Sequence, residues 1–272
     1  MSVVVLEPYT APAVPLEAPE IRPDAFAALS EAEIARLPVW HGKEAAQVGD
    51  FFRVKGGRSA DVRIAGHAGR VKHLGNGMAG GRLVIEGNAG AHVGAEMTGG
   101  RIIVEGDAGP WAGAEMRGGV LEIRGNADSH LAAAYAGSPR GMTGGLVLVH
   151  GSAGNLVGER MRRGIVAVAG DVGDYAGAAM LAGTLLAFGR LGRRPGAGLR
   201  RGTILAGGEV ELLPTFRYAC TYRPTFLRVY LRRLREEYGL SVDPRFFDGA
   251  YRRYNGDFAD LGRGELLIWT TP

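Results

Sequence analysis

Side chains that could hydrolyse a bond or bind a metal occur in the sequence, but their spacing forms no recognisable site. Asp128, Ser129 and His130 are the residue types of a hydrolytic triad. Sequence neighbours cannot form that hydrogen-bonded relay, however, and no nucleophile elbow surrounds the serine. The six histidines, at positions 41, 67, 73, 92, 130 and 150, show no metal-ligand spacing. We therefore predict no catalytic residue and no metal ligand in this chain.

Cofactor binding by a glycine-rich loop is the next candidate chemistry. Gly75-Asn-Gly77-Met-Ala-Gly80 has the spacing of the dinucleotide-binding fingerprint. That motif functions only between a strand and the helix that follows it, whereas here it lies inside a repeat of strands. No Walker pattern for phosphate binding occurs either. We predict that the chain holds no cofactor of its own.

The cysteine content restricts redox and metal chemistry further. Cys220 is the single cysteine, which excludes an internal disulfide, an all-cysteine zinc site and an iron–sulfur cluster held by this chain alone. It lies between Tyr218 and Tyr222 in an apolar stretch. We expect a buried, unreactive thiol.

The composition is that of a soluble globular protein, with 272 residues of which 46% are hydrophobic and 22% charged. No apolar run reaches the length of a membrane span and no basic segment precedes the apolar N-terminus, so we expect a cytoplasmic protein without a membrane partner. Residues 186–235 hold 11 arginines against two glutamates. This basic segment predicts either an acidic partner or ligand or a solvated face, and we expect no nucleic acid.

The elements that would position any site form a repeat. Glycine accounts for 45 residues, and units such as 81–98 combine an apolar run, a glycine, an Asn or Asp and one methionine. Each run is a strand followed by turns, with no room for a helix. Together these features predict an all-β solenoid, a right-handed parallel β-helix with coils of about 19 residues in about eight rungs. The glycine that ends each run lies at 66, 87, 106, 125, 151, 170, 189 and 207 or 208.

The repeat also predicts which side chains face inward. Apolar residues alternate within each run, as in Leu83 and Ile85, which places one column inside the solenoid. A methionine recurs once per unit and is typical of a stacked interior ladder. Two further glycines of each unit predict corners with positive φ or close approach of the next coil. The ladder consists of Met78, Met97, Met116, Met142, Met161, Met180 and Leu199.

Both ends of such a stack need caps, because solenoid ends expose unpaired strand edges. We divide the chain into an N-terminal arm and cap (1–50), the β-helix (51–208) and a C-terminal capping or docking segment (209–272). Ser30 with Glu33 predicts a capping box that opens a short N-terminal helix. An amphipathic helix is predicted over 225–238, with Leu227, Leu231 and Leu234 on its apolar side.

Two features predict contact with other proteins. The insertion at 126–142 interrupts the period, and Leu131, Tyr135 and Arg140 lie within it. The outward-facing position of the strands is largely apolar, which implies a cover that is either the C-terminal segment or another protein. The partner-docking candidates in this outward row are Val84, Ile103, Leu148 and Leu186.

The repeat resembles the GXGXG family of right-handed parallel β-helices, which includes the C subunit of formylmethanofuran dehydrogenase and the C-terminal domain of the large glutamate synthase subunit. The segment 49–54 resembles the first strand of that family. Tyr254-Asn-Gly-Asp257 and Gly262-Arg-Gly-Glu-Leu266 resemble the closing segment of the dehydrogenase C subunits. The resemblance covers residues of roughly 25 to 272.

This resemblance implies a structural subunit, and the arginine-rich, lysine-poor composition makes it more similar to the C subunit of the bacterial formyltransferase/hydrolase complex. Such a complex is implied to move a formyl group from tetrahydromethanopterin to a methanofuran analogue and to release formate during formaldehyde oxidation. Its implied partners are a zinc-dependent, amidohydrolase-like catalytic subunit, a formyltransferase subunit and one further subunit. No catalytic residue transfers to this chain. We expect Arg228, Arg232 and Arg233 to steer a polyglutamate tail of the methanofuran-type cofactor.

Three alternatives stay open. The chain could be the C subunit of an archaeal-type formylmethanofuran dehydrogenase, or a glutamate synthase-like β-helix domain. It could also be a free-standing β-helix enzyme that transfers acyl groups or acts on polysaccharides. The period does not fit a hexapeptide acyltransferase, and a carbohydrate enzyme would need a row of carboxylates. Glu86, Glu96, Glu105 and Glu115 recur in only two units.

Overall fold

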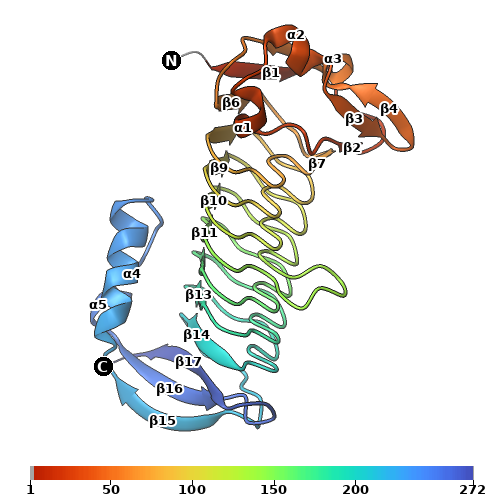
Figure 1. Ribbon diagram of the computed structural model, residues 1–272. Helices are drawn as coiled ribbons and strands as arrows, with labels where there is room; N and C mark the ends of the chain where they lie inside the picture. The colour runs from red at the N-terminus through yellow and green to blue at the C-terminus, as the bar shows by residue number, and fades with distance from the viewer. Residues whose placement is uncertain (1–2, 272) are drawn as a thin grey trace.

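The computed structural model describes residues 3–271 and is built mainly from β-strands (Figure 1). One sheet contains 13 strands, most of them parallel, and a second sheet contains four. The helices are few and short, and among residues 3–271 none has the length and apolarity that a membrane crossing requires. The predicted mostly-β fold with successive parallel strands is confirmed.

The central part of the chain stacks one strand per repeat into the large sheet, so that Figure 1 shows a column of similar coils. Residues 19 positions apart are direct neighbours, as in the pairing of Ile85 with Val104. Isolated bridges from Ala68 to Leu191 form a second parallel ladder. The strands are β6 (Asp61–Ile64), β8 (Arg82–Ile85), β9 (Arg101–Val104), β10 (Val120–Ile123), β11 (Leu146–Val149), β12 (Ile165–Val168), β13 (Thr184–Ala187) and β14 (Arg201–Ala206).

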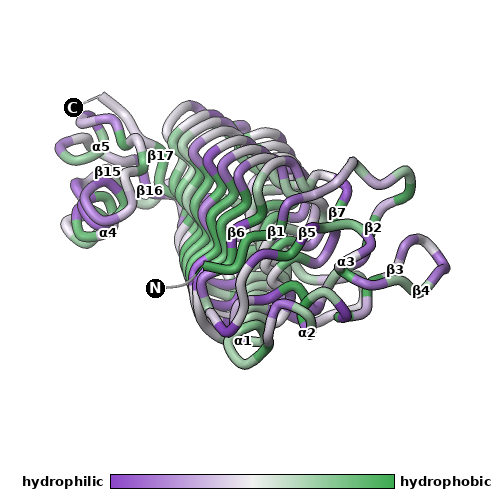
Figure 2. Tube along the Cα trace, turned by 90° about the horizontal axis from the view of Figure 1, so that it is seen from above, coloured by the Kyte–Doolittle hydropathy of each residue, from purple (hydrophilic) through white to green (hydrophobic). Residues whose placement is uncertain are grey.

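The interior of the stack is apolar and tightly packed. All six repeating methionines and Leu199 are fully buried, as predicted, and Figure 2 shows similar residues repeated in line down the stack. The dinucleotide-like glycine motif belongs to this packing. Met78 is buried, and Gly75 has a φ of +67° with Ile102 directly beside the place that a Cβ would occupy. Gly75 therefore serves close packing, and the helix that phosphate binding would need does not follow the motif.

The N-terminal region contains several short strands in addition to the short helix that the sequence predicts. The capping box is confirmed, since the Ser30 N–H donates to Glu33 Oε2 at 2.8 Å. β1 enters the large sheet between β5 and β6, while β4, β3, β2 and β7 form the small sheet. Short strands paired over long sequence distances leave little periodic signal. The elements are β1 (Val4–Pro8), β2 (Leu16–Glu17), α1 (Pro23–Phe26), α2 (Glu31–Ala35), β3 (Pro38–His41), β4 (Glu44–Gln47), α3 (Val48–Phe51), β5 (Phe52–Lys55) and β7 (Val71–Lys72).

The C-terminal region extends the large sheet and then covers it. β17 pairs in parallel with β14, and β16 and β15 follow antiparallel, so β15 ends the sheet. The amphipathic helix α4 lies along the flank of the coils, two residues shorter than predicted (Figures 1 and 2). The elements are β15 (Arg217–Tyr222), α4 (Thr225–Glu236), α5 (Arg245–Asp248), β16 (Ala250–Gly256) and β17 (Arg263–Thr270).

Candidate functional site

The described residues contain no arrangement that fits metal or triad chemistry. Nowhere in 3–271 do three His, Cys, Asp or Glu side chains gather as a metal-binding group. Asp128 Oδ1 accepts the backbone N–H of Ser129 at 2.6 Å, and Ser129 Oγ accepts that of Asn155 at 3.2 Å. His130 stacks on Trp111 at 4.4 Å instead of facing the serine. These side chains therefore order a loop, as sequence neighbours should.

The outward row of the coils nearer the C-terminus, β11 to β14 (the lower coils), is covered by the chain's own C-terminal helix α4. Leu227, Leu231 and Leu234 of α4 are buried in one cluster with the outward residues of β11 to β14. Leu148 and Leu186 are 0% exposed as a result. The structure thus assigns this cover to the C-terminal segment, which corrects the prediction that these two leucines meet a partner. The outward residues that α4 covers are Leu148, Ala167, Leu186 and Leu205.

The coils nearer the N-terminus, β6 to β9 (the upper coils), lie beyond the buried face of α4. They carry the two remaining docking candidates of the outward row. Val84 of β8 is half-buried, and Ile103 of β9 is 5% exposed. Arg63 and Glu86 form an ion pair in the same region. Of the predicted outward docking row, Val84 presents the most accessible apolar surface.

The insertion projects from the stack as a loop (Figure 1), but its first residues pack inward. Leu131 is fully buried in the main core, so the structure corrects its assignment as a docking residue. Tyr135 is half-buried, with its hydroxyl 2.9 Å from His92 Nδ1 and its backbone N–H donating to Glu115 Oε1 at 3.1 Å. Arg140 is exposed. Only Arg140 is therefore presented to solvent in the way that was predicted for all three residues.

A column of aromatic rings accompanies Tyr135 along one corner of the stack. His73, His92, Trp111 and His130 occupy the same place in successive coils, with ring centroids 4.4, 5.6 and 4.4 Å apart. Burial, and then the nearby His73, lower the pKa of His92 to about 4, while burial raises that of Tyr135 to about 12. Both groups are consequently neutral at pH 7. The 19-residue spacing of these four residues is the signal in the sequence that could have revealed the column.

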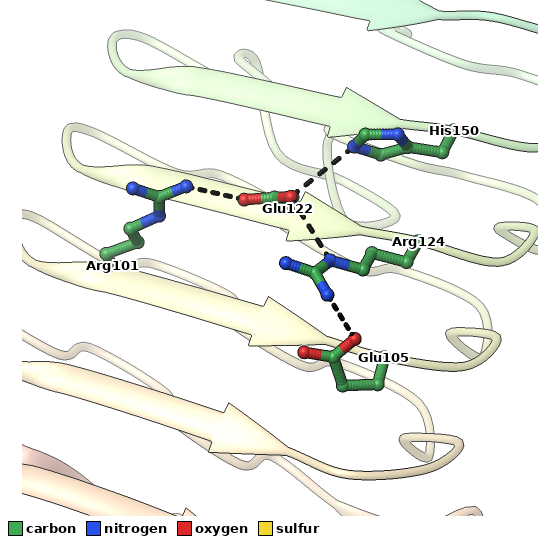
Figure 3. Close-up of polar contacts among 5 residues, drawn as sticks. All are labelled: Arg101, Glu105, Glu122, Arg124 and His150. Atoms are coloured by element: carbon green, nitrogen blue, oxygen red, sulfur yellow. Dashed lines mark hydrogen bonds and ion pairs between the residues drawn. The ribbon is translucent and has the colours of Figure 1, made fainter. Parts of the chain in front are cut away.

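Among residues 3–271 the most buried charged side chain is that of Glu122, which lies on β10 in the outward row (Figure 3). Its side chain is 3% exposed and lies 2.7 Å from Arg101 Nη2, 3.5 Å from Arg124 Nε and 3.4 Å from His150 Nε2. Arg124 also binds Glu105 at 2.6 Å. The contacts with His150 and Arg101 outweigh burial and lower the pKa of Glu122 to about 2. Glu122 is therefore ionised at neutral pH, and its contacts link three successive coils. A carboxyl group that does not carry a proton at this pH is unsuited to general acid catalysis.

Replacing Glu122 with glutamine is expected to lower the free energy of unfolding by about 2 kcal/mol at pH 7, less than for a fully buried pair because both arginines are half-exposed. Since the folded pKa is depressed, this stabilisation exists above the unfolded pKa of about 4.3 and disappears as pH falls towards 2. Urea unfolding of both proteins between pH 7 and pH 2 measures it. Glu105→Gln is the control, with an expected loss below about 1 kcal/mol. A pH-independent difference would contradict this assignment.

The three arginines expected to steer a cofactor tail lie on the exposed side of α4, but two of them are engaged. Arg228 donates to Phe247 O at 2.8 Å and to Asp248 Oδ1 at 3.0 Å. Arg233 Nε binds Glu237 Oε2 at 2.9 Å. Arg232 forms no ion pair among the residues that the structure describes. The fit of this trio to an anionic ligand therefore depends mainly on Arg232.

A more basic groove lies at the start of the strands nearer the C-terminus. Two of its arginines belong to the basic segment 186–235, but the charge pattern of the sequence did not indicate the other two. The groove has a volume of about 600 Å³ and is lined by Arg162, Arg163, Arg200 and Arg201, with Tyr230 of α4 on one side. Arg200 binds Asp260 at 2.7 Å, whereas the other three arginines form no ion pair within 3–271. The strand register that gathers them was predictable, but the approach of Tyr230 was not.

Cys220 also differs from expectation. It is exposed on β15, and the predicted buried thiol is wrong. The apolar neighbours in sequence suggested a core strand, but every residue of β15 except Tyr222 is exposed. A strand at the end of a sheet lacks the covering layer that would bury it.

Comparison with known proteins adds to this geometry. No family model matches the sequence. The C subunit of a tungsten-containing formylmethanofuran dehydrogenase from Methanothermobacter thermautotrophicus is 41% identical over 93 residues, which cover 32% of this chain and 34% of that protein. The C subunit of the molybdenum-containing enzyme from Methanosarcina barkeri is 43% identical over 95 residues, covering 33% of this chain and 32% of that protein. Each alignment therefore spans only about a third of the relative.

A solved structure matches nearly the whole chain. The crystal structure of the formyltransferase/hydrolase complex (FhcABCD) from Methylorubrum extorquens, determined with methylofuran, contains a chain that superposes with a TM-score of 0.89. The two chains are 35% identical, and the match covers 97% of this chain and 98% of that one. The chain therefore belongs to the family formed by the C subunits of formylmethanofuran dehydrogenase and the matching subunit of the formyltransferase/hydrolase complex.

Proposed function

We propose that the chain is the noncatalytic structural subunit, the C subunit, of a formyltransferase/hydrolase complex. The observation that carries this proposal is the match over 97% of the chain to a chain of such a complex. In the proposal, a right-handed parallel β-helix of 19-residue coils in about eight rungs is a stiff support. It holds together an amidohydrolase-like catalytic subunit, a formyltransferase subunit and one further subunit.

The chemistry is proposed to reside in those partners. The complex would transfer a formyl group from tetrahydromethanopterin to a methanofuran analogue and hydrolyse it to formate during formaldehyde oxidation. Zinc would serve the hydrolytic subunit. The residues of this chain do not fit a zinc site, because no group of three candidate ligands occurs within 3–271. We therefore assign no catalytic step to this chain.

The interior supports a mechanical role. The inward columns and the methionine ladder are filled by apolar side chains that form one continuous core. The carboxylate of Glu122 is already paired with Arg101, Arg124 and His150 of this chain. What the chain offers to other molecules lies on its outer surface.

The test is purification of the chain, with a tag, from its native organism. We expect the amidohydrolase-like and formyltransferase subunits to accompany it, as identified by mass spectrometry, and the assembly to transfer formyl groups. The chain expressed alone should be inactive and should aggregate. Formyl transfer by the purified, lone chain, or its recovery without any of these subunits, would overturn the proposal.

Steering of an anionic cofactor tail is a separate prediction. Replacing Arg228, Arg232 and Arg233 together with alanine should weaken binding of a methanofuran-type cofactor to the complex several-fold and reduce its dependence on salt. Arg232→Ala alone should account for most of the effect, since the other two arginines are engaged within the chain. Arg36→Ala, exposed near the N-terminus, is the control. Unchanged affinity and salt dependence in the triple variant would remove this role.

A second candidate is the C subunit of an archaeal-type formylmethanofuran dehydrogenase. The identities of 41% and 43% to such subunits favour it, although over about a third of the chain. The same purification separates the two, because a tungsten or molybdenum enzyme would accompany the chain only in the second case.

A further inference from the structure

The large sheet ends in a strand whose outer edge has no partner in the part of the chain that the structure describes. β15 pairs only with β16, and its residues Arg217 to Cys220 are exposed on both faces. A sheet edge of this kind presents a row of free N–H and C=O groups that can pair with another strand. Natural edges are protected by lysine, proline, inward charges or bulges. β15 has one irregularity, at Tyr218 and Cys220, and neither lysine nor proline.

The opposite end of the same sheet is protected in the usual way. β5 carries Lys55, which binds Glu7, and α2 packs against it. The contrast singles out β15 as the open edge.

The surface around β15 has the composition of a protein interface. Tyr218 is 57% exposed and Phe258 is 49% exposed. Arg217 lies over the ring of Phe258 at 5.2 Å. Aromatic residues and arginine are enriched at protein interfaces, whereas lysine is depleted. Residues 209–272 contain no lysine at all.

The charge of this edge indicates what should bind there. Arg217 begins β15 and Arg223 follows it, and neither forms an ion pair within 3–271. No acidic residue lies between them. An extended segment that pairs with β15 would gain two ion pairs if it carried carboxylates opposite the ends of the strand.

We propose that β15 is a docking edge, to which an extended, acidic segment of a partner subunit adds a strand. A second copy of the chain fits less well. Antiparallel pairing of β15 with itself would bring Arg217 of each copy beside Arg223 of the other, and like charges facing one another across strands are destabilising. The partner segment continues the sheet, so the coils and the partner share one hydrogen-bonded layer.

This inference rests on the proposed role in a complex, and Cys220 supplies its test. As the single cysteine, exposed on β15, it reports whether the edge is covered. In the purified complex, labelling of Cys220 by a maleimide should be at least about tenfold slower than in the free chain, and the amides of 217–222 should gain protection from hydrogen exchange. If Cys220 and these amides react equally in both, docking at β15 is excluded.

A charge-reversal variant completes the test. Replacing Arg217 and Arg223 with glutamate should lower the yield of assembled complex about tenfold. Arg36→Glu with Arg70→Glu, two exposed arginines near the N-terminal end that form no ion pair within 3–271, should not. Assembly unaffected by the first pair contradicts the inference but leaves the proposed function intact. Failure of the wild-type chain to recover any subunit contradicts the proposed function itself. Protection of 217–222 in a dimer of the free chain would assign the edge to a second copy instead.

Discussion

Gly118→Ala is expected to lower the free energy of unfolding by about 3 kcal/mol, or to prevent folding, because overpacking a tight contact displaces backbone. A Cβ at this position would overlap the carbonyl oxygen of Thr98 in the preceding coil. That oxygen belongs to the main chain of a paired coil and cannot turn away as a side chain could. Urea unfolding followed by circular dichroism measures the effect.

The repeat supplies a matched control at the same place in another coil. Gly80 lies two coils before Gly118 in the strand register, and nothing lies within 4 Å of the place its Cβ would occupy. Gly80→Ala should therefore change stability by less than about 1 kcal/mol. Equal losses at the two positions would show that backbone conformation, rather than the spacing of the coils, requires these glycines.

Leu231→Ala is expected to destabilise the C-terminal region by about 3 kcal/mol, a typical cost for a fully buried leucine. Leu231 is 0% exposed and lies in the cluster that joins α4 to β11 through β14. Because coils interact mainly with their neighbours, the loss should be local: 225–248 should exchange amide hydrogens faster while the upper coils keep their protection. Mass-detected hydrogen exchange resolves the two regions.

The control for this variant lies on the same helix. Val229 is 69% exposed, so Val229→Ala should leave the exchange pattern unchanged. The variant Leu231→Ala should also expose Leu148 and Leu186, and dye binding to apolar surface should rise. Uniform loss of protection across the whole chain would contradict a separately docked helix.

Much of the architecture could be predicted, because period and packing come from the same residues. The 19-residue repeat determines which strands are neighbours, and the buried methionines confirm which side faces inward. The capping box at Ser30 and the start of α4 at Thr225 are local signals that the structure reproduces. Such elements depend on neighbours in sequence or on an exact repeat.

The rest depends on contacts between segments that share no periodic signal. β1 joins the sheet beside β6 through pairing across more than 50 residues, and nothing local marks it. In the sequence Glu122 is one polar member of an outward row. In the structure it is buried, and its charge is balanced by two arginines and a histidine that come from three different coils. Cys220 was expected inside because its neighbours are apolar, and only the position of β15 at the end of the sheet explains its exposure.

The match in length between α4 and the stack limits how the chain can grow or shrink. The helix has 12 residues and is about 18 Å long, which equals nearly four strand spacings of about 4.8 Å. It covers the outward side chains of four successive strands, β11 to β14. A coil could be gained or lost above β10 and change only the distance between the two ends, in steps of one strand spacing. From β11 to β14 the length of α4 matches the height of the coils that it covers. Adding or removing a coil there would therefore require a longer or shorter helix.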